Sequence, residues 1–288
     1  MRTMRVTQER LLFELADFQF LTVSQAMRLI GLSSTAISDN LSRLAKEKNP
    51  TVACQDYMNN GRWGRNESIY YLTAAGVKVL EQRGLSADQI KFPKGRRVAF
   101  TSDYHHRIWT VDVFIALKLY AKAEGHELEY FSYYFQQNAG SNRHNKGGKH
   151  LSDNRIDVGA MGMGYVVPDG VFMLRREGDK PIFGLVEQHN GDDTSRAMKQ
   201  IEAHCVALSK GAASLAFDAK HEGEYVGNRV FFSFELENYM RYAMHRFAKS
   251  AAFEDFGHCF LFRSAQSIRE GNFEDEWVYA NGAPFTLR

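Results

Sequence analysis

Two acidic residues, Asp169 and Glu187, lie in consecutive stretches of strand-forming residues, Tyr165–Leu174 and Pro181–His189. A short polar segment with a glycine joins the stretches, which is typical of an antiparallel hairpin. A carboxylate within such an apolar run is costly unless it has a partner, and a hard divalent cation is one such partner. Asp169 and Glu187, called the acid pair below, therefore predict a Mg²⁺ or Mn²⁺ site that could hold a phosphate.

Each residue of this region also has a plainer interpretation. Asp169 falls in Pro168-Asp169-Gly170, which is a common turn sequence. Glu187 could be an acid near a strand end that points to water. His189 could ligate a metal, act as a general base, contact a phosphate, or be a solvated strand-end residue. The residue types alone leave these alternatives open.

The segments around the hairpin must position these side chains. Their periodicity predicts, in chain order, a helix over 103–123, a strand over 127–137, the hairpin, a helix over 193–209, a strand over 230–235, a helix over 238–249 and a strand over 258–263. Residues 138–155 form a polar, basic, glycine-containing loop. On the first helix, Asp112 or His106 could complete the metal site. The adjacent His105 points about 100° away, so only one of the two histidines can face the site.

A second set of elements precedes the hairpin domain. Three helices are expected, beginning near Thr7, Thr22 and Ser33, and the tight turn Gly31–Ser33 separates the second from the third. Strands over 51–56 and 68–73 and a closing helix follow. A helix, a short glycine-containing turn and another helix indicate a helix-turn-helix. The two strands with an exposed tip over 59–66 add a wing, so we expect a winged helix-turn-helix.

Double-stranded DNA is the expected partner of this first module. The third helix offers short polar groups and an arginine suited to base edges and phosphates, and the wing offers two arginines suited to the backbone. Residues 1–100 hold 15 Lys or Arg against 9 Asp or Glu, whereas the remaining residues hold 21 against 25. A basic first part fits contact with DNA. The expected contact residues are Ser34, Thr35, Ser38, Asn40, Arg43, Arg62 and Arg65.

Composition excludes several other classes. No stretch approaches 18 uncharged apolar residues, so no membrane contact is expected, and no apolar signal segment follows Met1. The three cysteines are odd in number and far apart, which argues against a disulfide framework and favours the cytoplasm. A glycine-rich phosphate loop and a zinc-deaminase motif are both absent.

We expect a DNA-binding domain over 1–90, a linker over 91–101 and a second domain over 102–288.

The second domain resembles the PD-(D/E)XK nuclease superfamily in its helix-strand-strand-strand-helix-strand order, with Asp169 on one central strand and Glu187 on the next. The resemblance implies a restriction-endonuclease-like α/β domain with a central mixed sheet. The superfamily's usual lysine, two residues after the glutamate, is replaced by His189. Lys199 on the following helix lies where some members carry a migrated lysine. The resemblance thus implies Asp169, Glu187, His189 and Lys199 as catalytic residues.

The two domains together resemble the replication-relaxation family, which includes the MobC-type plasmid mobilisation relaxases, over roughly residues 8–235. The resemblance implies an α+β protein that nicks one DNA strand at a plasmid transfer or replication origin with Mg²⁺ or Mn²⁺, alongside other relaxosome proteins. The alternative is a non-catalytic regulator of plasmid replication or transcription with a degenerate nuclease-like domain. The missing lysine favours the regulator, whereas the acid pair favours the enzyme.

Overall fold

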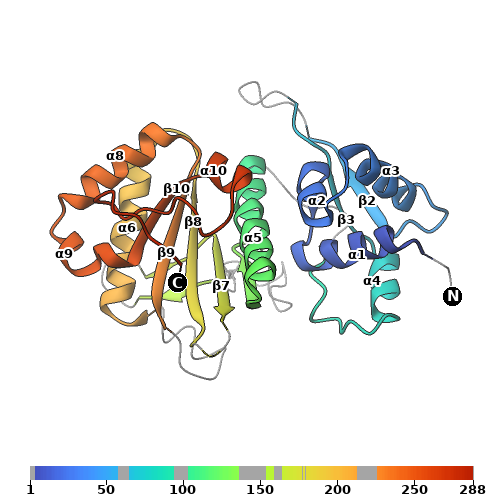
Figure 1. Cartoon of the computed structure of the whole chain (residues 1–288), viewed down its shortest axis with the longest axis horizontal. Coiled ribbons are helices and arrows are strands. Elements are labelled where there is room, and N and C mark those ends of the chain that lie inside the picture. The colour runs from blue at the N-terminus through green and yellow to red at the C-terminus, as the bar shows by residue number, and fades with distance from the viewer. Residues whose placement is uncertain are drawn as a thin grey trace, which may run out of the picture. The chain divides into compact units, whose positions relative to one another are not determined.

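A computed structural model describes residues 4–57, 65–93, 103–135, 154–158, 164–176, 178, 180–212 and 226–287. The chain divides into two compact units, residues 1–102 and 103–288, and each is described by itself (Figure 1). Most of the expected linker, most of the basic loop and Arg62 at the expected wing tip lie outside the described residues.

In its described residues, the first unit combines four helices with a small sheet. Its elements are α1 (Val6–Phe18), β1 (Leu21–Thr22), α2 (Val23–Ile30), α3 (Ser34–Ala45), β2 (Val52–Gln55), β3 (Ile69–Leu72) and α4 (Ala74–Glu81). The strands pair antiparallel in the order β1-β3-β2.

Local capping explains where these helices begin. The side chain of Thr22 accepts a hydrogen bond from the Gln25 backbone N–H at the start of α2, and Ser33 does the same for Ala36 at the start of α3. Gly31 ends α2 with φ of 76°, a left-handed conformation that glycine adopts without strain. The predicted cap of the first helix, Thr7, was wrong by two positions. The helix begins at Val6, and its N-cap residue is Arg5.

The second unit is a mixed α+β structure around one five-stranded sheet. Its elements are α5 (Tyr104–Glu124), β4 (Glu127–Tyr133), β5 (Ile156–Asp157), β6 (Tyr165–Val166), β7 (Gly170–Arg175), β8 (Ile182–His189), α6 (Thr194–Ser209), β9 (Val226–Phe234), α8 (Glu237–Ala248), α9 (Ala252–Phe256), β10 (Phe260–Ser264) and α10 (Ala265–Glu270). The strand order is β10-β9-β8-β7-β4. Pairing is antiparallel from β4 through β7 to β8, and parallel from β8 through β9 to β10. This confirms the prediction of a mixed central sheet.

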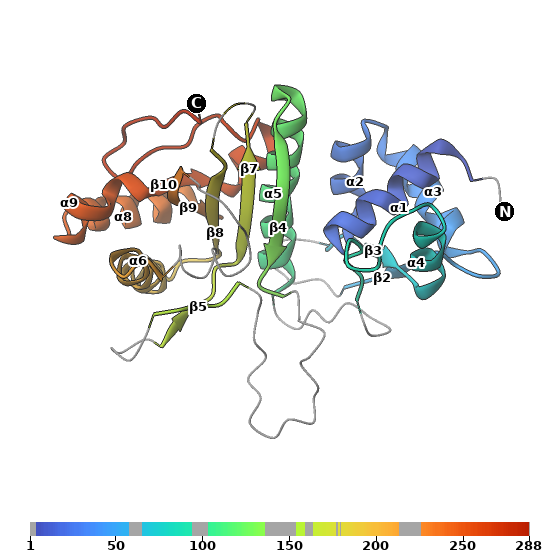
Figure 2. The same ribbon diagram turned by 90° about the horizontal axis from the view of Figure 1, so that it is seen from below.

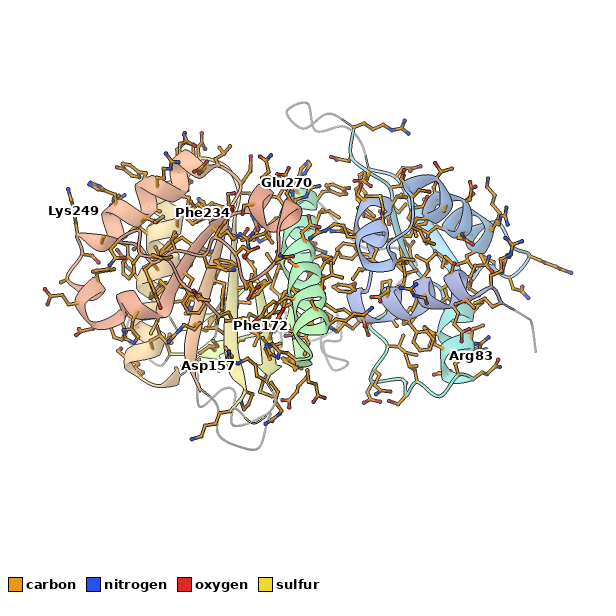
Figure 3. The ribbon with its side chains drawn as sticks, in the orientation of Figure 1. Arg83, Asp157, Phe172, Phe234, Lys249 and Glu270 are labelled. Atoms are coloured by element: carbon orange, nitrogen blue, oxygen red, sulfur yellow. The ribbon has the colours of Figure 1, made fainter. Side chains whose placement is uncertain are left out.

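Helices cover both faces of this sheet. Figures 1 and 2 show α6 and α8 on one side of the strands and α5 on the other. Phe172 of β7 lies in the layer between the sheet and α5 (Figure 3), where its ring meets those of Phe114 and Phe231. The opposite layer is also apolar, with Leu185 and Phe232 fully buried. The layer between the sheet and α5 has no room for a side chain at Gly184, because a Cβ there would lie 2.1 Å from the Phe172 ring.

The stretch over 165–174 is not one strand, which corrects that expectation. Tyr165–Val166 pairs with Ile156–Asp157 in a separate two-stranded ladder, and β7 begins only at Gly170. Pro168 explains the break because it has no backbone N–H to contribute to a ladder. Asp169 therefore lies immediately before β7.

Among the described residues, no helix combines the length and apolar character needed to cross a bilayer. All three cysteines are free thiols, with Cys54 exposed and Cys205 and Cys259 buried.

Candidate active site at the ends of β7 and β8

The register of the hairpin brings the acid pair together. Strands β7 and β8 pair Gly170 with Val186, and one further step of this antiparallel register sets Asp169 opposite Glu187. Directly opposed residues of an antiparallel pair project to the same face, about 5 Å apart. Both residues are buried, with 8% and 2% of their surface exposed. Asp169 is thus not a solvated turn residue, and Glu187 does not point to water.

Both oxygens of Asp169 have partners. Oδ1 lies 2.9 Å from His106 Nε2, and Oδ2 accepts a hydrogen bond of 2.8 Å from the backbone N–H of Gln188. His106 lies in the first turn of α5, so it reaches the end of β7 from a different element. His106, one of the two residues suggested to complete a metal site, thus lies beside Asp169.

Glu187 is held by two residues of α6 that the sequence did not single out. His204 Nε2 lies 2.6 Å from Glu187 Oε1, and Gln200 Nε2 donates to Oε2 at 2.8 Å. Gln200 and His204 are four residues apart, so they share one face of α6. Their sequence signal is this pair of polar residues at helical spacing.

Burial and like charge dominate the electrostatics of the acid pair. Burial raises the pKa of Glu187 well above its usual range, and the neighbouring Asp169 carboxylate raises it further. Burial lowers the pKa of His204 to about 4. Both shifts have burial as their main cause, and both disfavour the charged form of the side chain. Burial alone would lower the pKa of His106, but the Asp169 carboxylate offsets this and raises it.

A second group of contacts fixes the first turn of α5 against the sheet. Asp103 Oδ2 accepts from Arg107 Nε at 2.7 Å and from the Tyr134 hydroxyl at 2.9 Å. The Tyr134 backbone N–H in turn donates to the Asp169 carbonyl at 3.0 Å. Burial opposes ionisation of Asp103, but the Arg107 guanidinium holds its pKa below the usual value. These contacts hold the first turn of α5, which carries His106, next to Asp169.

Asn154 supports the segment that precedes Asp169. Its side-chain amide, which is buried, donates to the carbonyls of Pro168 at 3.2 Å and Ser132 at 3.3 Å. One side chain thus ties the end of β4 to the residue before Asp169. This matters because Pro168 interrupts the ladder that would otherwise fix the position.

His189 lies at the same end of β8 as the acid pair. It is 2% exposed, and its ring centroid lies 5.0 Å from that of Phe234. Burial lowers its pKa, and the positive charge of Arg196 lowers it further. Within the described ranges, His189 Nε2 is buried without a hydrogen-bond partner.

Two predicted residues lie elsewhere. Asp112 is buried on α5, but its Oδ2 lies 3.1 Å from Arg269 Nε of α10, so it belongs to that helix contact rather than to the acid pair. Six residues of helix separate it from His106, a rotation of about 240°. Lys199 is exposed on α6. The face of α6 that points to Glu187 carries Gln200 and His204 instead.

The expected DNA-contact residues of the first unit are mostly accessible. Ser34, Thr35 and Arg43 of α3 are exposed, as is Arg65. Ser38 is partly buried. Asn40 points back along the helix, because its Nδ2 donates to the Ala36 carbonyl at 2.8 Å and its Oδ1 is buried.

The donor set at the acid pair fits a cation with few protein ligands. In the described part of the chain, no group of three or more His, Cys, Asp or Glu is arranged to hold a metal. Mg²⁺ is commonly bound through one or two carboxylates, with waters and substrate phosphates filling its other positions. Each carboxylate oxygen here has one hydrogen-bond partner and a remaining lone pair. Two buried carboxylates that repel each other suit such a cation.

Comparison with protein families gives a match. The sequence model of the family described as replication-relaxation matches residues 12–197, well over half of the chain. The chain belongs to the replication-relaxation family. The matched region of this replication-relaxation protein includes the whole acid pair and the first turn of α6, and it ends before Gln200 and His204.

Other comparisons add little. No curated protein matches the chain. Among solved structures, the restriction endonuclease FokI bound to DNA is similar with a TM-score of 0.32 and 11% sequence identity. That similarity covers 98% of this chain and 45% of the FokI chain, so this protein spans less than half of that enzyme's length.

Proposed function

We propose that this protein is a DNA-processing relaxase, or nickase, which binds duplex DNA at a plasmid transfer or replication origin and cuts one strand. The observation that carries the proposal is the acid pair, with two buried carboxylates side by side, Asp169 just before β7 and Glu187 on the neighbouring strand β8. Membership of the replication-relaxation family supports a role in DNA processing.

Asp169 and Glu187 would hold Mg²⁺ or Mn²⁺ in this proposal. Such a cation, when bound, would polarise the scissile phosphate and activate water as the nucleophile. It would also relieve the repulsion that raises the pKa of Glu187. His106, Gln200 and His204 orient the carboxylate oxygens through their hydrogen bonds, which is how the partners of metal ligands usually act.

The elements of the second unit support a nuclease-like fold. From α5 through β4, β7, β8 and α6 to β9, the chain order is helix, three antiparallel strands, helix and a parallel strand. This is the order that the PD-(D/E)XK resemblance implies, with β5 and β6 as an insertion. His189 stands at the position of the usual lysine, and its buried ring could accept a proton from water or contact a phosphate.

The first unit would find the DNA as a winged helix. The compact helices α2 and α3 are joined by the short Gly31 turn, and β2 and β3 flank the segment expected to form the wing. Exposed Ser34 and Thr35 at the start of α3 suit base edges, and Arg43 and Arg65 suit phosphates.

A second function is favoured by one observation. All four carboxylate oxygens of the acid pair already accept hydrogen bonds or contact a histidine. Among the described residues, no three or more His, Cys, Asp or Glu are grouped so that they could hold a metal. A protein built this way could be a non-catalytic DNA-binding regulator whose nuclease-like unit only keeps its structure.

A nicking assay separates the two functions. Supercoiled plasmid carrying the cognate origin is incubated with the protein and Mg²⁺ or Mn²⁺, with a chelator as control. A nickase converts supercoiled DNA to open circles only when the metal is present. Origin binding without any conversion, in either metal, would favour the regulator.

A further inference from the structure

Phosphate binding beside the acid pair poses an electrostatic problem. A DNA phosphodiester is an anion, and Asp169 and Glu187 are acidic groups in a poorly solvated position. A metal ion compensates part of this repulsion. A positively charged side chain near the same end of β8 would compensate more of it. Such a side chain would have to face this end of the sheet.

Arg196 meets this requirement through its position on α6. Arg196, Gln200 and His204 follow one another at intervals of four residues, so they form a single stripe along the helix. The last two contact Glu187 directly. Arg196 lies about 6 Å nearer the N-terminus of α6 than Gln200, on the side where β8 ends at His189.

The Arg196 side chain is also available. It is exposed, and within the described part of the chain its guanidinium has no hydrogen-bond or ion-pair partner. Arg196 shares its helix face with Gln200 and His204, which contact Glu187 near the end of β8. The buried His189 Nε2, which lacks a hydrogen-bond partner among the described residues, lies at the same end.

We propose that Arg196 binds the scissile phosphate, or the phosphate next to it, beside the acid pair. A guanidinium presents a planar fork of donors that matches two phosphate oxygens, so a single arginine can both neutralise and orient the group. The first turn of α6 adds a favourable dipole for an anion. This inference rests on the proposed function, because it assigns a role at the same site.

Four single variants test the role of Arg196. Arg196→Ala removes the guanidinium, and Arg196→Lys retains the charge without the fork. Lys199→Ala removes an exposed cation three residues further along the same helix. Lys249→Ala, at the end of α8, controls for loss of one exposed positive charge. Because all three wild-type side chains are exposed, the variants should fold, which circular dichroism and thermal melting check.

Two readouts are needed. The first is the rate of Mg²⁺-dependent nicking at saturating DNA, where loss of a phosphate-stabilising donor typically costs about 100-fold. The second is binding of full-length protein to a fluorescent duplex in Ca²⁺ over a range of salt concentrations. Loss of one phosphate contact should make the slope of log affinity against log salt shallower by about one.

The expected result is a slower nicking rate and a shallower salt slope for Arg196→Ala, a partial return for Arg196→Lys, and wild-type behaviour for Lys249→Ala. If Arg196→Ala matches Lys249→Ala in both measurements, or if only Lys199→Ala shows the losses, the proposal is overturned. If the wild-type protein does not nick, the proposed function fails, and the salt slope alone then decides whether Arg196 contacts phosphate.

Discussion

His204 Nε2 lies 2.6 Å from Glu187 Oε1, and neither side chain is more than 2% exposed. A histidine from α6 therefore determines the orientation of a carboxylate on β8. The contact ties the helix to the edge of the candidate site, so the geometry of the acid pair depends on how α6 packs.

Replacing His204 should remove the contact through which α6 orients the Glu187 carboxylate. His204→Ala leaves a buried carboxyl oxygen without its partner, which costs about 1–3 kcal/mol of stability, and it should raise the Mg²⁺ concentration needed for half-maximal nicking. Urea unfolding and a metal titration of the nicking rate measure the two effects. His204→Gln keeps an N–H donor and should recover part of both.

The exposed His258 offers a matched control for this change. His258→Ala should leave both stability and metal dependence at the wild-type values. The account of Glu187 would be wrong if His204→Ala were equally silent.

The sequence revealed the hairpin but not the residues that complete its site. Strand patterning, together with the turn between the two stretches, was enough to pair β7 with β8, since both signals are local. The contacts of Glu187 with Gln200 and His204 cross 13 and 17 residues and depend on the rotation of α6. One residue along a helix changes the direction of a side chain by about 100°, which separates Lys199 from Gln200.

Other differences also follow from rotation or from backbone chemistry. Asp112 is a buried acid on the expected helix, but its side chain points to Arg269 rather than to the end of β7. The expected strand over 165–174 is broken because Pro168 cannot donate a hydrogen bond. The caps of α2 and α3, at Thr22 and Ser33, were predictable because a capping side chain acts within its own first turn.

Close packing at Gly184 gives a prediction for stability. A Cβ at this position would lie 2.1 Å from the ring of Phe172, its partner across the β7–β8 ladder. Gly184→Ala should therefore cost about 1–3 kcal/mol, because the ring must shift within a packed layer. Urea unfolding measures the loss. Gly164→Ala is the control, since no atom lies within 4 Å of its Cβ position, and an equal loss in both variants would argue against this packing.

The proposed winged helix predicts two kinds of effect on DNA binding. Arg43→Ala and Arg65→Ala should weaken binding to all sequences alike and each make the salt slope shallower by about one, because phosphates carry no sequence information. Thr35→Ala should instead change the preference among sequences, by about 1–3 kcal/mol at the contacted base pair. Binding titrations against a set of duplexes distinguish these outcomes.

Lys78 of α4 provides the control for net charge in that series, because it is exposed and outside α3 and the strands. Lys78→Ala should bind as the wild type does. A first unit that docks onto protein rather than DNA would show no change in duplex affinity for any of these variants.

The most direct test of the acid pair is the nicking rate of two nearly isosteric variants, Asp169→Asn and Glu187→Gln. Each removes one anionic oxygen ligand, so Mg²⁺-dependent conversion of supercoiled to open-circular plasmid should be abolished while duplex binding is retained. Asp112→Asn alters a buried carboxylate of the same unit that pairs with Arg269, and it should still nick under conditions where it is folded. Nicking at the wild-type rate by both Asp169→Asn and Glu187→Gln would contradict a metal-dependent site at the end of β7 and β8.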